Sequence, residues 1–407
     1  MSSPSASRTV RGAVLLASLG YFVDIYDLIL FAVVRTRSLT DIGVSGEALT
    51  GTGAHLMSMQ MTGMLLGGFL WGILGDKKGR LSVLFGSILM YSVANLANAF
   101  VHTVPAYAAW RLIAGIGLAG ELGAGVTLVS ELMSKETRGY GTMLIAGIGV
   151  MGAIAASLVA QFLDWRMAYL LGGVMGILLL LLRIRVSESG MFSTLKAGTH
   201  SRGDLLLILR SPSRLLRYLC CVGVGLPIWF VIGILVLFSP ELGKAMGMTE
   251  APVAGKAVLW CYTGLAIGDF LTGFLSQRLG SRRGVLFAFI LLTGAAAAAF
   301  LGLKAPTPGV LYSLCFGLGV GGGYWAVFVT TAAEHFGTNL RATVATTAPN
   351  LVRGALVPMT AAFLFLKASR GPIGAAAVVG GVVCVLALVS LAGLHETHGK
   401  DLDFVES

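Results

Sequence analysis

Six charged side chains stand within stretches of the chain that are otherwise apolar, and their types point to proton exchange and anion binding. They are Asp24, Asp27, Arg111, Glu121, Asp269 and Arg353. Inside a bilayer such a side chain costs about 2.5–3.5 kcal/mol on insertion scales, so it usually faces a polar cavity and serves a function there. A carboxylate can bind and release a proton, whereas arginine stays charged and can hold an anionic group.

Asp24 and Asp27 lie in "GYFVDIYDLILF" (20–31), and their spacing of three residues places both on one face of a helix. A nearby charge or a change in burial alters how readily a carboxylate binds a proton. We therefore expect Asp24 and Asp27, influenced by Arg111 and Glu121, to couple proton movement to a conformational change. We favour Asp27 as the titrating residue because it should lie nearer to Arg111. The alternative is a structural ion pair that fixes the first helix to the fourth.

These charges must be positioned by membrane-spanning helices. The chain has 407 residues, of which 56% are hydrophobic and 12% are charged, against about 25% charged residues in soluble proteins. A helix needs about 20 apolar residues to cross a bilayer, and no apolar run alternates as a barrel strand would. The sequence predicts an all-α polytopic membrane protein with twelve transmembrane helices, at roughly 10–34, 54–75, 81–101, 106–133, 140–162, 167–186, 214–238, 254–277, 284–303, 309–335, 343–366 and 373–393.

The lysines and arginines indicate how these helices are oriented. Most of the 29 cluster in alternate connections, and connections rich in Lys and Arg face the cytoplasm. Both termini are then cytoplasmic, and we expect a multi-pass protein of a bacterial inner (plasma) membrane. Because this orientation accounts for the net charge of +10, we expect no nucleic-acid partner.

The sequence also predicts a duplication. "GILGDKKGR" (72–80) and "GFLSQRLGSRR" (273–283) share glycines, and Gly273 follows Gly72 by 201 positions. "ELMSKETR" (131–138) and "EHFGTNLR" (334–341) share an E-x6-R spacing at an offset of 203 positions. Two landmarks with nearly one offset predict two parallel-repeat six-helix bundles. The bundles are residues 1–186 and 214–393, joined by a cytoplasmic linker at 187–213 and followed by a cytoplasmic tail at 394–407.

The first of these motifs resembles the signature G-x-x-x-D-[RK]-x-G-[RK] that joins spans 2 and 3 in the major facilitator superfamily. "RLIAGIGLAGE" (111–121) resembles its fourth-span signature, R-x-x-x-G-x-G, and "LHETHGKDLDF" (394–404) resembles the tail of its sugar and metabolite porters. Within that superfamily the chain is similar to bacterial metabolite:proton symporters. The resemblance implies that spans 1, 4, 7 and 10 line a central cavity, and that first-span acids and the fourth-span arginine couple protons. The second copy of the loop signature departs from the pattern, since Gln277 stands where the first has Asp76.

Arg353 is the candidate for holding a substrate, because a guanidinium can bind a carboxylate through two hydrogen bonds. Asn350 lies one turn earlier on the same side of the predicted helix. The alternative is that Arg353 neutralises Asp269. Aromatic residues beside the expected cavity are candidates for its wall, namely Tyr21, Tyr26, Trp229, Phe230, Tyr324 and Trp325. The predicted substrate site consists of Arg353, Asn350, Tyr26, Trp229, Tyr324 and Gln161.

Charged residues of the cytoplasmic connections are candidates for a gate. The duplicated E-x6-R spacing favours pairs that close the cytoplasmic side over a solvated set of charges that only fixes the topology. The predicted gate comprises Asp76, Lys77, Arg80, Glu131, Arg138, Arg282, Glu334 and Arg341.

The sequence lacks a nucleotide-binding G-x-x-x-x-G-K-[ST] motif, a set of metal ligands and a nucleophile–base pair, so we expect no enzyme, no cofactor and no bound metal. We expect a secondary active transporter, monomeric in the lipid bilayer. It would carry a small organic anion of the carboxylate type together with protons, by rocker-switch alternating access. The alternatives are a proton-coupled exporter (antiporter) of drugs or metabolites, a facilitative uniporter, and a sensor on the same fold that binds without transport.

Overall fold

The computed structural model of the chain describes residues 4–46, 48–78, 80–121, 123, 133, 138–188, 205–400 and 406. Every regular element within these residues is helical, as the composition predicts. Eight helical segments of the described chain are long and apolar enough to cross a membrane. The all-helical class is therefore confirmed, whereas the full count of twelve spans stays a prediction.

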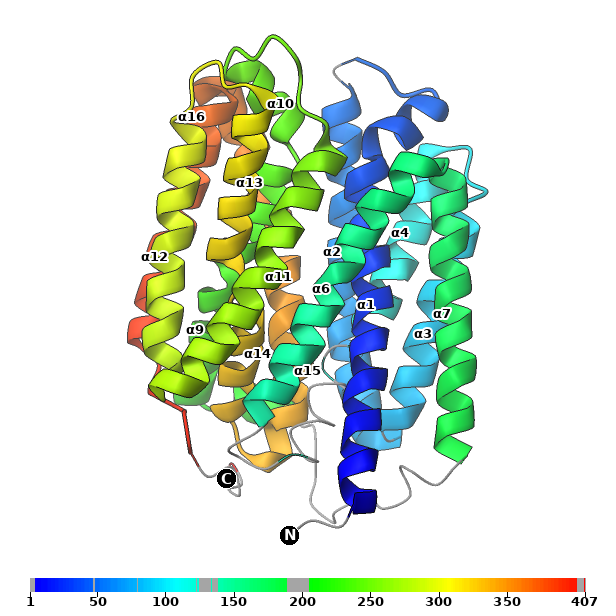
Figure 1. The fold of residues 1–407 in the computed structure, drawn as a ribbon, viewed down its shortest axis with the longest axis vertical. Helices are drawn as coiled ribbons and strands as arrows, with labels where there is room; N and C mark the ends of the chain where they lie inside the picture. Colours follow the sequence, from blue (N-terminus) through cyan, green and yellow to red (C-terminus); the bar gives the residue numbers. More distant parts are fainter. Residues whose placement is uncertain are drawn as a thin grey trace.

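The first group of helices lies on one side of the molecule, coloured blue to green (Figure 1). It consists of α1 (Pro4–Asp41), α2 (Ala48–Lys78), α3 (Arg80–Asn98), α4 (Val104–Leu118), α6 (Arg138–Phe162) and α7 (Trp165–Glu188). Local sequence explains where α4 begins, because the Thr103 hydroxyl caps it by accepting from the Ala106 N–H and Pro105 occupies its first turn.

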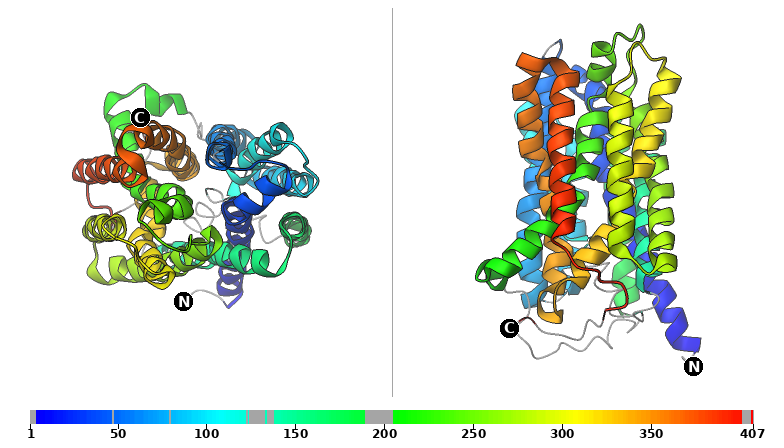
Figure 2. Two further views of the ribbon diagram at one scale, coloured as in Figure 1. Left: turned by 90° about the horizontal axis from the view of Figure 1, so that it is seen from above. Right: turned by 90° about the vertical axis from the view of Figure 1, so that its left-hand side faces the viewer.

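The second group lies beside the first, coloured green to red. It consists of α8 (Leu205–Leu209), α9 (Pro212–Phe230), the π-helix η1 (Val231–Val236), α10 (Ser239–Ala245), α11 (Ala254–Leu279), α12 (Arg282–Leu301), α13 (Pro308–Gly322), α14 (Trp325–Glu334), α15 (Thr338–Gly354) and α16 (Leu356–Ala392). The start of α1 and the end of α16 lie at the same end of the molecule (Figure 2), and α10 lies at the opposite end.

Three of the predicted spans are interrupted rather than straight. The run predicted at 214–238 changes from α9 into the π-helix η1, and the run at 309–335 breaks between α13 and α14. The run at 343–366 is divided between α15 and α16, and α16 has its own break at Gly371, whose φ is 68°. Breaks at membrane depth are tolerated where they line a cavity or are buried in protein, because the exposed backbone groups then find partners.

Glycines let helices cross with their backbones in contact. A Cβ on Gly115 of α4 would collide with the carbonyl oxygen of Gln60 in α2, and a Cβ on Gly319 of α13 would collide with that of Cys261 in α11. Cys261 follows Gln60 by 201 positions, and Gly319 follows Gly115 by 204, which is close to the offset of the two sequence motifs. The same close crossing therefore recurs in both groups of helices, as small residues allow in lipid.

An ion pair joins the two groups at the end opposite the chain termini. Arg35 of α1 donates to Glu241 of α10 at 3.0 Å, and the Thr50 hydroxyl of α2 donates to the same carboxylate at 3.2 Å. The Arg35 guanidinium also lies 5.2 Å from the centre of the Phe238 ring. This end of the molecule is therefore held closed by a partly buried, charge-assisted contact.

The tail after α16 folds back onto the turn between α11 and α12. That turn is tight because Gly280 takes a left-handed conformation (φ 62°) and Ser281 then caps α12. The Glu396 carboxylate accepts from the backbone N–H groups of Arg282 and Arg283, at 2.9 and 3.1 Å. A carboxylate at a helix N-terminus is favourable, since the N–H groups there lack partners in the helix.

This contact should make the stability of the protein depend on pH. Partial burial pushes the pKa of Glu396 up from 4.5, but the hydrogen bonds that its carboxylate accepts outweigh burial and lower the pKa to about 2. A depressed pKa contributes stability that is full above about pH 4.5 and is lost as the pH falls towards 2. Replacing Glu396 by Gln should lower the unfolding midpoint at pH 7 by the equivalent of about 1 kcal/mol, allowing for solvent screening.

Thermal unfolding of the purified protein in detergent, from pH 7 down to pH 3, measures this effect. The difference in unfolding midpoint between wild type and Glu396→Gln should become smaller as the pH falls. Glu250 lies in an exposed loop, so Glu250→Gln should leave the midpoint unchanged. A difference that stays constant across this pH range would show that the Glu396 charge contributes nothing.

Candidate functional site

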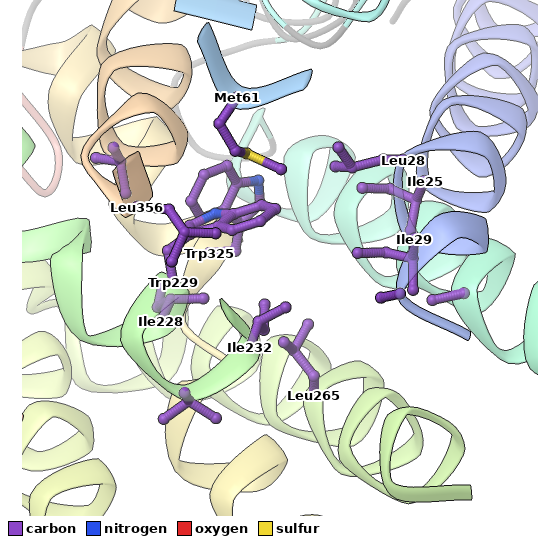
Figure 3. Packing of buried hydrophobic residues seen from close by; sticks show 14 of the residues in the cluster. Ile25, Leu28, Ile29, Met61, Ile228, Trp229, Ile232, Leu265, Trp325 and Leu356 are labelled. Carbon is purple, nitrogen blue, oxygen red and sulfur yellow. The ribbon is translucent and has the colours of Figure 1, made fainter. Parts of the chain in front are cut away.

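A small cavity lies between the two groups of helices. Half of its lining residues are aliphatic and come from both groups: Val150, together with Ile25, Ile228, Ile232 and Leu265, which are labelled in Figure 3. The remaining lining residues carry polar groups: Tyr21, Trp229, Tyr262, Trp325 and Arg353. A mostly apolar cavity with a few convergent polar groups is the usual form of a small-molecule site.

Among the described residues of this lining Arg353 is the only charged one, and its side chain is held in place by neutral groups. Its two terminal nitrogens donate to Asn350 at 3.2 Å and to the Tyr21 hydroxyl at 3.3 Å. Its guanidinium also lies 5.3 Å from the Trp325 ring centre and 6.0 Å from that of Trp229, which are cation–π distances. Tyr21 belongs to α1, so the contact joins the two groups of helices.

The cavity offers hydrogen-bond donors more than acceptors. The Arg353 Nε and Trp325 Nε1 atoms are buried, and within the described residues neither makes a hydrogen bond of good geometry, although the Tyr21 hydroxyl lies near the Trp325 side chain. Both atoms can only donate. An acceptor carried on an apolar body, such as a carboxylate on a ring, matches a cavity of this kind.

The predicted alternative, in which Arg353 neutralises Asp269, does not match the geometry. The Asp269 Oδ1 atom instead accepts from the backbone N–H of Ala326, at 3.0 Å. No ion pair joins these two residues in the described part of the chain.

Asp24 and Asp27 are both fully buried, and none of their four carboxylate oxygens has a hydrogen-bond partner in the part of the chain that the structure describes. The charges that act on Asp24 are those of Arg353, Glu121 and Arg183, with Arg353 the strongest. Asp27 is influenced by Asp24 and Arg111, and Asn95 lies beside it without reaching hydrogen-bond geometry. The two aspartates therefore face different arginines, one in each group of helices.

Arg111 does not touch either aspartate. It donates to the Gln60 side chain of α2 and, at 3.4 Å, to the Tyr169 hydroxyl of α7. Its guanidinium lies 4.4 Å from the centre of the Phe31 ring. The direct Asp–Arg contact between the first and fourth spans, which the sequence made geometrically reasonable, is absent from the described residues, and the two charges act on each other only at longer range.

Glu121 is paired with Arg183, which lies near the end of α7. Both Arg183 terminal nitrogens donate to the Glu121 carboxylate, one of them at 3.0 Å, and both side chains are buried. Arg183 also reaches the Leu16 carbonyl oxygen of α1 at 3.5 Å. Gly20 makes room for this pair, since a Cβ there would collide with both side chains.

The other predicted substrate residues lie outside the cavity lining. Asn350 supports Arg353, while its own amide donates to the carbonyl oxygens of Ala119 and Thr346. The hydroxyl groups of Tyr26 and Tyr324 donate to the Ala168 and Val224 carbonyl oxygens, each at 3.0 Å. Gln161 lies at the exposed end of α6 and donates to Ser157 at 3.3 Å. Of the six, only Trp229 and Arg353 line the cavity.

Tyr21, Tyr262 and Trp325 complete the lining. Tyr21 lines the cavity in place of the predicted Tyr26, and Trp325 does so in place of the predicted Tyr324. In each case the rotation of the helix about its axis determines which of the two aromatic residues faces the cavity. Residues 21 and 26 differ by about 140° around a helix, because each residue turns it by about 100°. Tyr262 carries no signal in the sequence beyond its place in an apolar run.

Part of the predicted gate is described. Arg282 of α12 pairs with Glu334 of α14, at 3.4 Å, and donates to the Ser276 hydroxyl at 2.8 Å. Glu334 also accepts from Thr397 of the tail at 2.8 Å. Arg341 is buried at the start of α15. Glu131 and the side chains of Asp76, Lys77, Arg80 and Arg138 lie outside the described residues.

Comparison with known proteins identifies the family. The family model of the Major Facilitator Superfamily matches residues 17–348. The chain is 27% identical to a putative niacin/nicotinamide transporter of Bacillus subtilis over 84% of each chain. It is 28% identical to the 3-(3-hydroxy-phenyl)propionate transporter of Escherichia coli over 83% of each chain. It is 27% identical to the gentisate transporter of Corynebacterium glutamicum, over 94% of this chain and 87% of that one.

A solved structure has the same fold. The proton:xylose symporter XylE, bound to 6-bromo-6-deoxy-D-glucose, superposes with a TM-score of 0.74 over 98% of both chains. Sequence identity is 17%, so the likeness concerns the fold alone. The relatives and the fold are those of transporters, and the expectation that the chain is not an enzyme is confirmed.

The Glu121–Arg183 pair gives a stability prediction. Replacing Arg183 by Met leaves the Glu121 carboxylate buried without its partner, and breaking a buried pair in this way costs about 3–5 kcal/mol. The double variant Glu121→Gln with Arg183→Met removes both charges and should be closer to wild type. Thermal unfolding in detergent micelles measures the order of stability.

Arg370→Met, which removes an exposed arginine, is the matched control and should leave the unfolding midpoint unchanged. If the loss of stability in the double variant equals the sum of the losses in Glu121→Gln and Arg183→Met, the two side chains act independently.

Proposed function

Because the chain belongs to the Major Facilitator Superfamily, we propose that it is a proton-coupled symporter of a small organic anion of the carboxylate type, working by rocker-switch alternating access. The observation that carries the proposal is the cavity between the two groups of helices, whose lining has a single charge, the Arg353 guanidinium. The superfamily makes the chain a transporter, and the chemistry of the cavity supports the substrate class.

Arg353 and Trp325 are the groups that would hold the carboxylate. The unpartnered Arg353 Nε and Trp325 Nε1 atoms can both donate to it, and the aliphatic wall would contact the apolar body of the substrate. Burial strengthens these hydrogen bonds, since no water competes for the donors. A sugar would need acceptors as well as donors, which this lining supplies only through two tyrosine hydroxyls.

The names of the relatives agree with this substrate class. Those names contain niacin or nicotinamide, 3-(3-hydroxyphenyl)propionate and gentisate, and all of these except the amide nicotinamide are carboxylic acids with an aromatic ring. A planar ring with one carboxylate is chemically compatible with a cavity whose wall carries indole and phenol groups beside a guanidinium. We therefore place aromatic monocarboxylates first among the candidate substrates.

Asp24 is the residue through which substrate and proton would be coupled. The strongest charge acting on Asp24 is that of Arg353, the proposed anchor of the substrate. An anion bound to Arg353 would cancel much of the positive field that this arginine exerts at Asp24, so proton binding and anion binding would favour each other. Mutual reinforcement of this kind is the thermodynamic requirement for symport. Asp27 faces Arg111 instead, so its influence on the substrate would be indirect.

The ion pair between Arg35 and Glu241 fits the alternating-access part of the proposal. It joins α1 to α10 across the two groups of helices, at the end opposite the chain termini. We propose that this end is extracellular, with twelve spans, cytoplasmic termini and a monomer in a bacterial inner membrane. Opening to the outside would then require this pair to separate.

Coupling can be measured with the protein in proteoliposomes. An acidic exterior should stimulate the uptake of a labelled aromatic monocarboxylate by wild type. In Asp24→Asn the stimulation should disappear, while substrate-for-substrate exchange continues, because the amide cannot carry a proton but the anchor remains. Asp27→Asn is the matched control, one turn away, and should keep part of the response.

Full stimulation in Asp24→Asn would assign the proton to another group. If wild type instead shows efflux that requires an opposite proton flux, the chain is an exporter. Uptake that does not respond to the gradient indicates a uniporter.

Arg353 gives a prediction on substrate affinity. Replacing it by Gln removes a charge-assisted contact worth about 1.5–3 kcal/mol, which raises KM by roughly 10- to 100-fold. Arg353→Lys keeps the charge but loses the planar guanidinium, so its KM should lie between that of wild type and that of Arg353→Gln. Substrate stabilisation in a thermal-shift screen against a carboxylate panel should fall in the same order. An unchanged KM in Arg353→Gln would remove this residue from the substrate site.

A further inference from the structure

The wall of the cavity depends on a break in the chain between α13 and α14. The segment "GVGGGYW" (319–325) ends α13 at Gly322 and begins α14 at Trp325. Tyr324 stands at the N-cap position of α14, and its side chain makes no capping hydrogen bond. The first N–H groups of α14 therefore need a partner from elsewhere, because a buried donor without an acceptor is costly.

Asp269 of α11 supplies that partner. Its Oδ1 atom accepts from the backbone N–H of Ala326, the second residue of α14, at 3.0 Å. This is the hydrogen bond that an N-cap side chain normally makes, here provided by a neighbouring helix. One turn later on α11, the Thr272 hydroxyl donates to the Gly323 carbonyl oxygen at 2.8 Å. The two side chains of α11 thus satisfy both sides of the break.

Glycine at position 323 makes this contact possible. A Cβ there would lie 2.7 Å from the backbone nitrogen of Asp269 and 2.5 Å from the Cα of Gly268. Any larger residue would push α11 away from the break and lengthen the hydrogen bond from Ala326. The break and the carboxylate therefore belong to one local arrangement.

The same hydrogen bond determines where Trp325 lies. Trp325 is the first residue of α14 and directly precedes Ala326, so the cap fixes its backbone. Its indole ring then reaches into the cavity beside Trp229 (Figure 3) and lies 5.3 Å from the Arg353 guanidinium. A loosened cap would let Trp325 leave the position in which it faces Arg353.

We propose that Asp269 is a positioning residue of the substrate cavity, whose side-chain oxygen caps α14 from α11 and holds Trp325 over Arg353. The effect on transport rests on the proposed function, whereas the effect on Trp325 does not. The acceptor oxygen carries this role rather than the negative charge. Asn keeps an acceptor oxygen of the same reach, and Leu has a similar volume without one, so Asp269→Asn and Asp269→Leu separate the two properties.

The position of Trp325 can be observed by 19F NMR on protein labelled with 5-fluorotryptophan in detergent. The chain has six tryptophans, and the resonance of Trp325 is assigned by its loss in Trp325→Phe. In Asp269→Leu this resonance should shift or split, while in Asp269→Asn it should stay close to its wild-type position. Trp260, exposed on α11 itself, is the internal control and should not move in either variant.

An unmoved Trp325 resonance in Asp269→Leu would overturn the proposal. So would a resonance that moves equally in both variants, because the charge rather than the acceptor would then matter. A Trp260 shift of the same size would indicate general unfolding of α11 and would also count against it. This readout needs no substrate, so it stands even if the protein carries no carboxylate.

Uptake kinetics in proteoliposomes give the second readout. Asp269→Leu should raise KM for the carboxylate about tenfold, the effect expected for the loss of one capping hydrogen bond. Asp269→Asn should stay within about threefold of wild type and keep its response to a pH gradient. If Asp269→Asn transports but no longer responds to the gradient, Asp269 carries a proton and the positioning role is wrong.

Discussion

A guanidinium buried at the centre of the molecule without a carboxylate in contact is the feature on which the rest depends. Arg353 is 1% exposed, and the groups that solvate it in the described structure are an amide, a phenol hydroxyl and two indole faces. A buried charge is costly unless polar groups surround it. These groups come from α1, α9, α14 and α15, so the solvation of one side chain requires both groups of helices to meet there.

Three other buried arginines show a contrast with Arg353 and Arg111, neither of which has a carboxylate in contact within the described residues. Arg183, Arg35 and Arg282 each contact a glutamate, and each pair joins helices that are distant in the sequence. The opposite charges of a pair in contact largely cancel each other's electrostatic field. Such a pair is suited to joining helices rather than to binding a charged ligand. The Arg353 charge is screened by neutral groups only, so a positive potential remains in the cavity. An anion entering the cavity would meet that potential, because Arg353, unlike Arg111, lines the cavity.

The sequence predicted the class of fold and the charged residues better than it predicted their partners. Composition and run length are enough for an all-helical membrane protein, because lipid excludes other arrangements of the backbone. Arg353 could be predicted as a functional residue because a charge within an apolar run is costly. The choice of Tyr21 over Tyr26 did not follow, since it depends on the rotation of α1 about its axis. Arg183 was also missed, because an arginine near a helix end looks the same whether it turns to solvent or back to Glu121.

The breaks in the helices could not be predicted from the sequence, for a related reason. Glycines in "GVGGGYW" indicate a weak helix, but the carboxylate that makes the break stable lies some 55 residues earlier, on α11. Asp269 had been weighed as a counter-charge for Arg353, which is the natural assumption when an acid and a base lie in one membrane domain. In the structure the Asp269 carboxylate instead accepts a hydrogen bond from the backbone. The charge of Arg353 is therefore available to an anionic substrate.

Two aspartates and two arginines then remain in one region without touching each other: Asp24, Asp27, Arg111 and Arg353. Each of these groups acts on the others only at a distance. A contact pair would have to be broken before a proton or an anion could bind, and breaking it costs several kcal/mol. Separated charges respond to a new ligand without that step. Because Tyr21 and Asp24 lie one turn apart on α1, and Tyr21 accepts a hydrogen bond from Arg353, a single helix face connects the anion site to the nearer carboxylate.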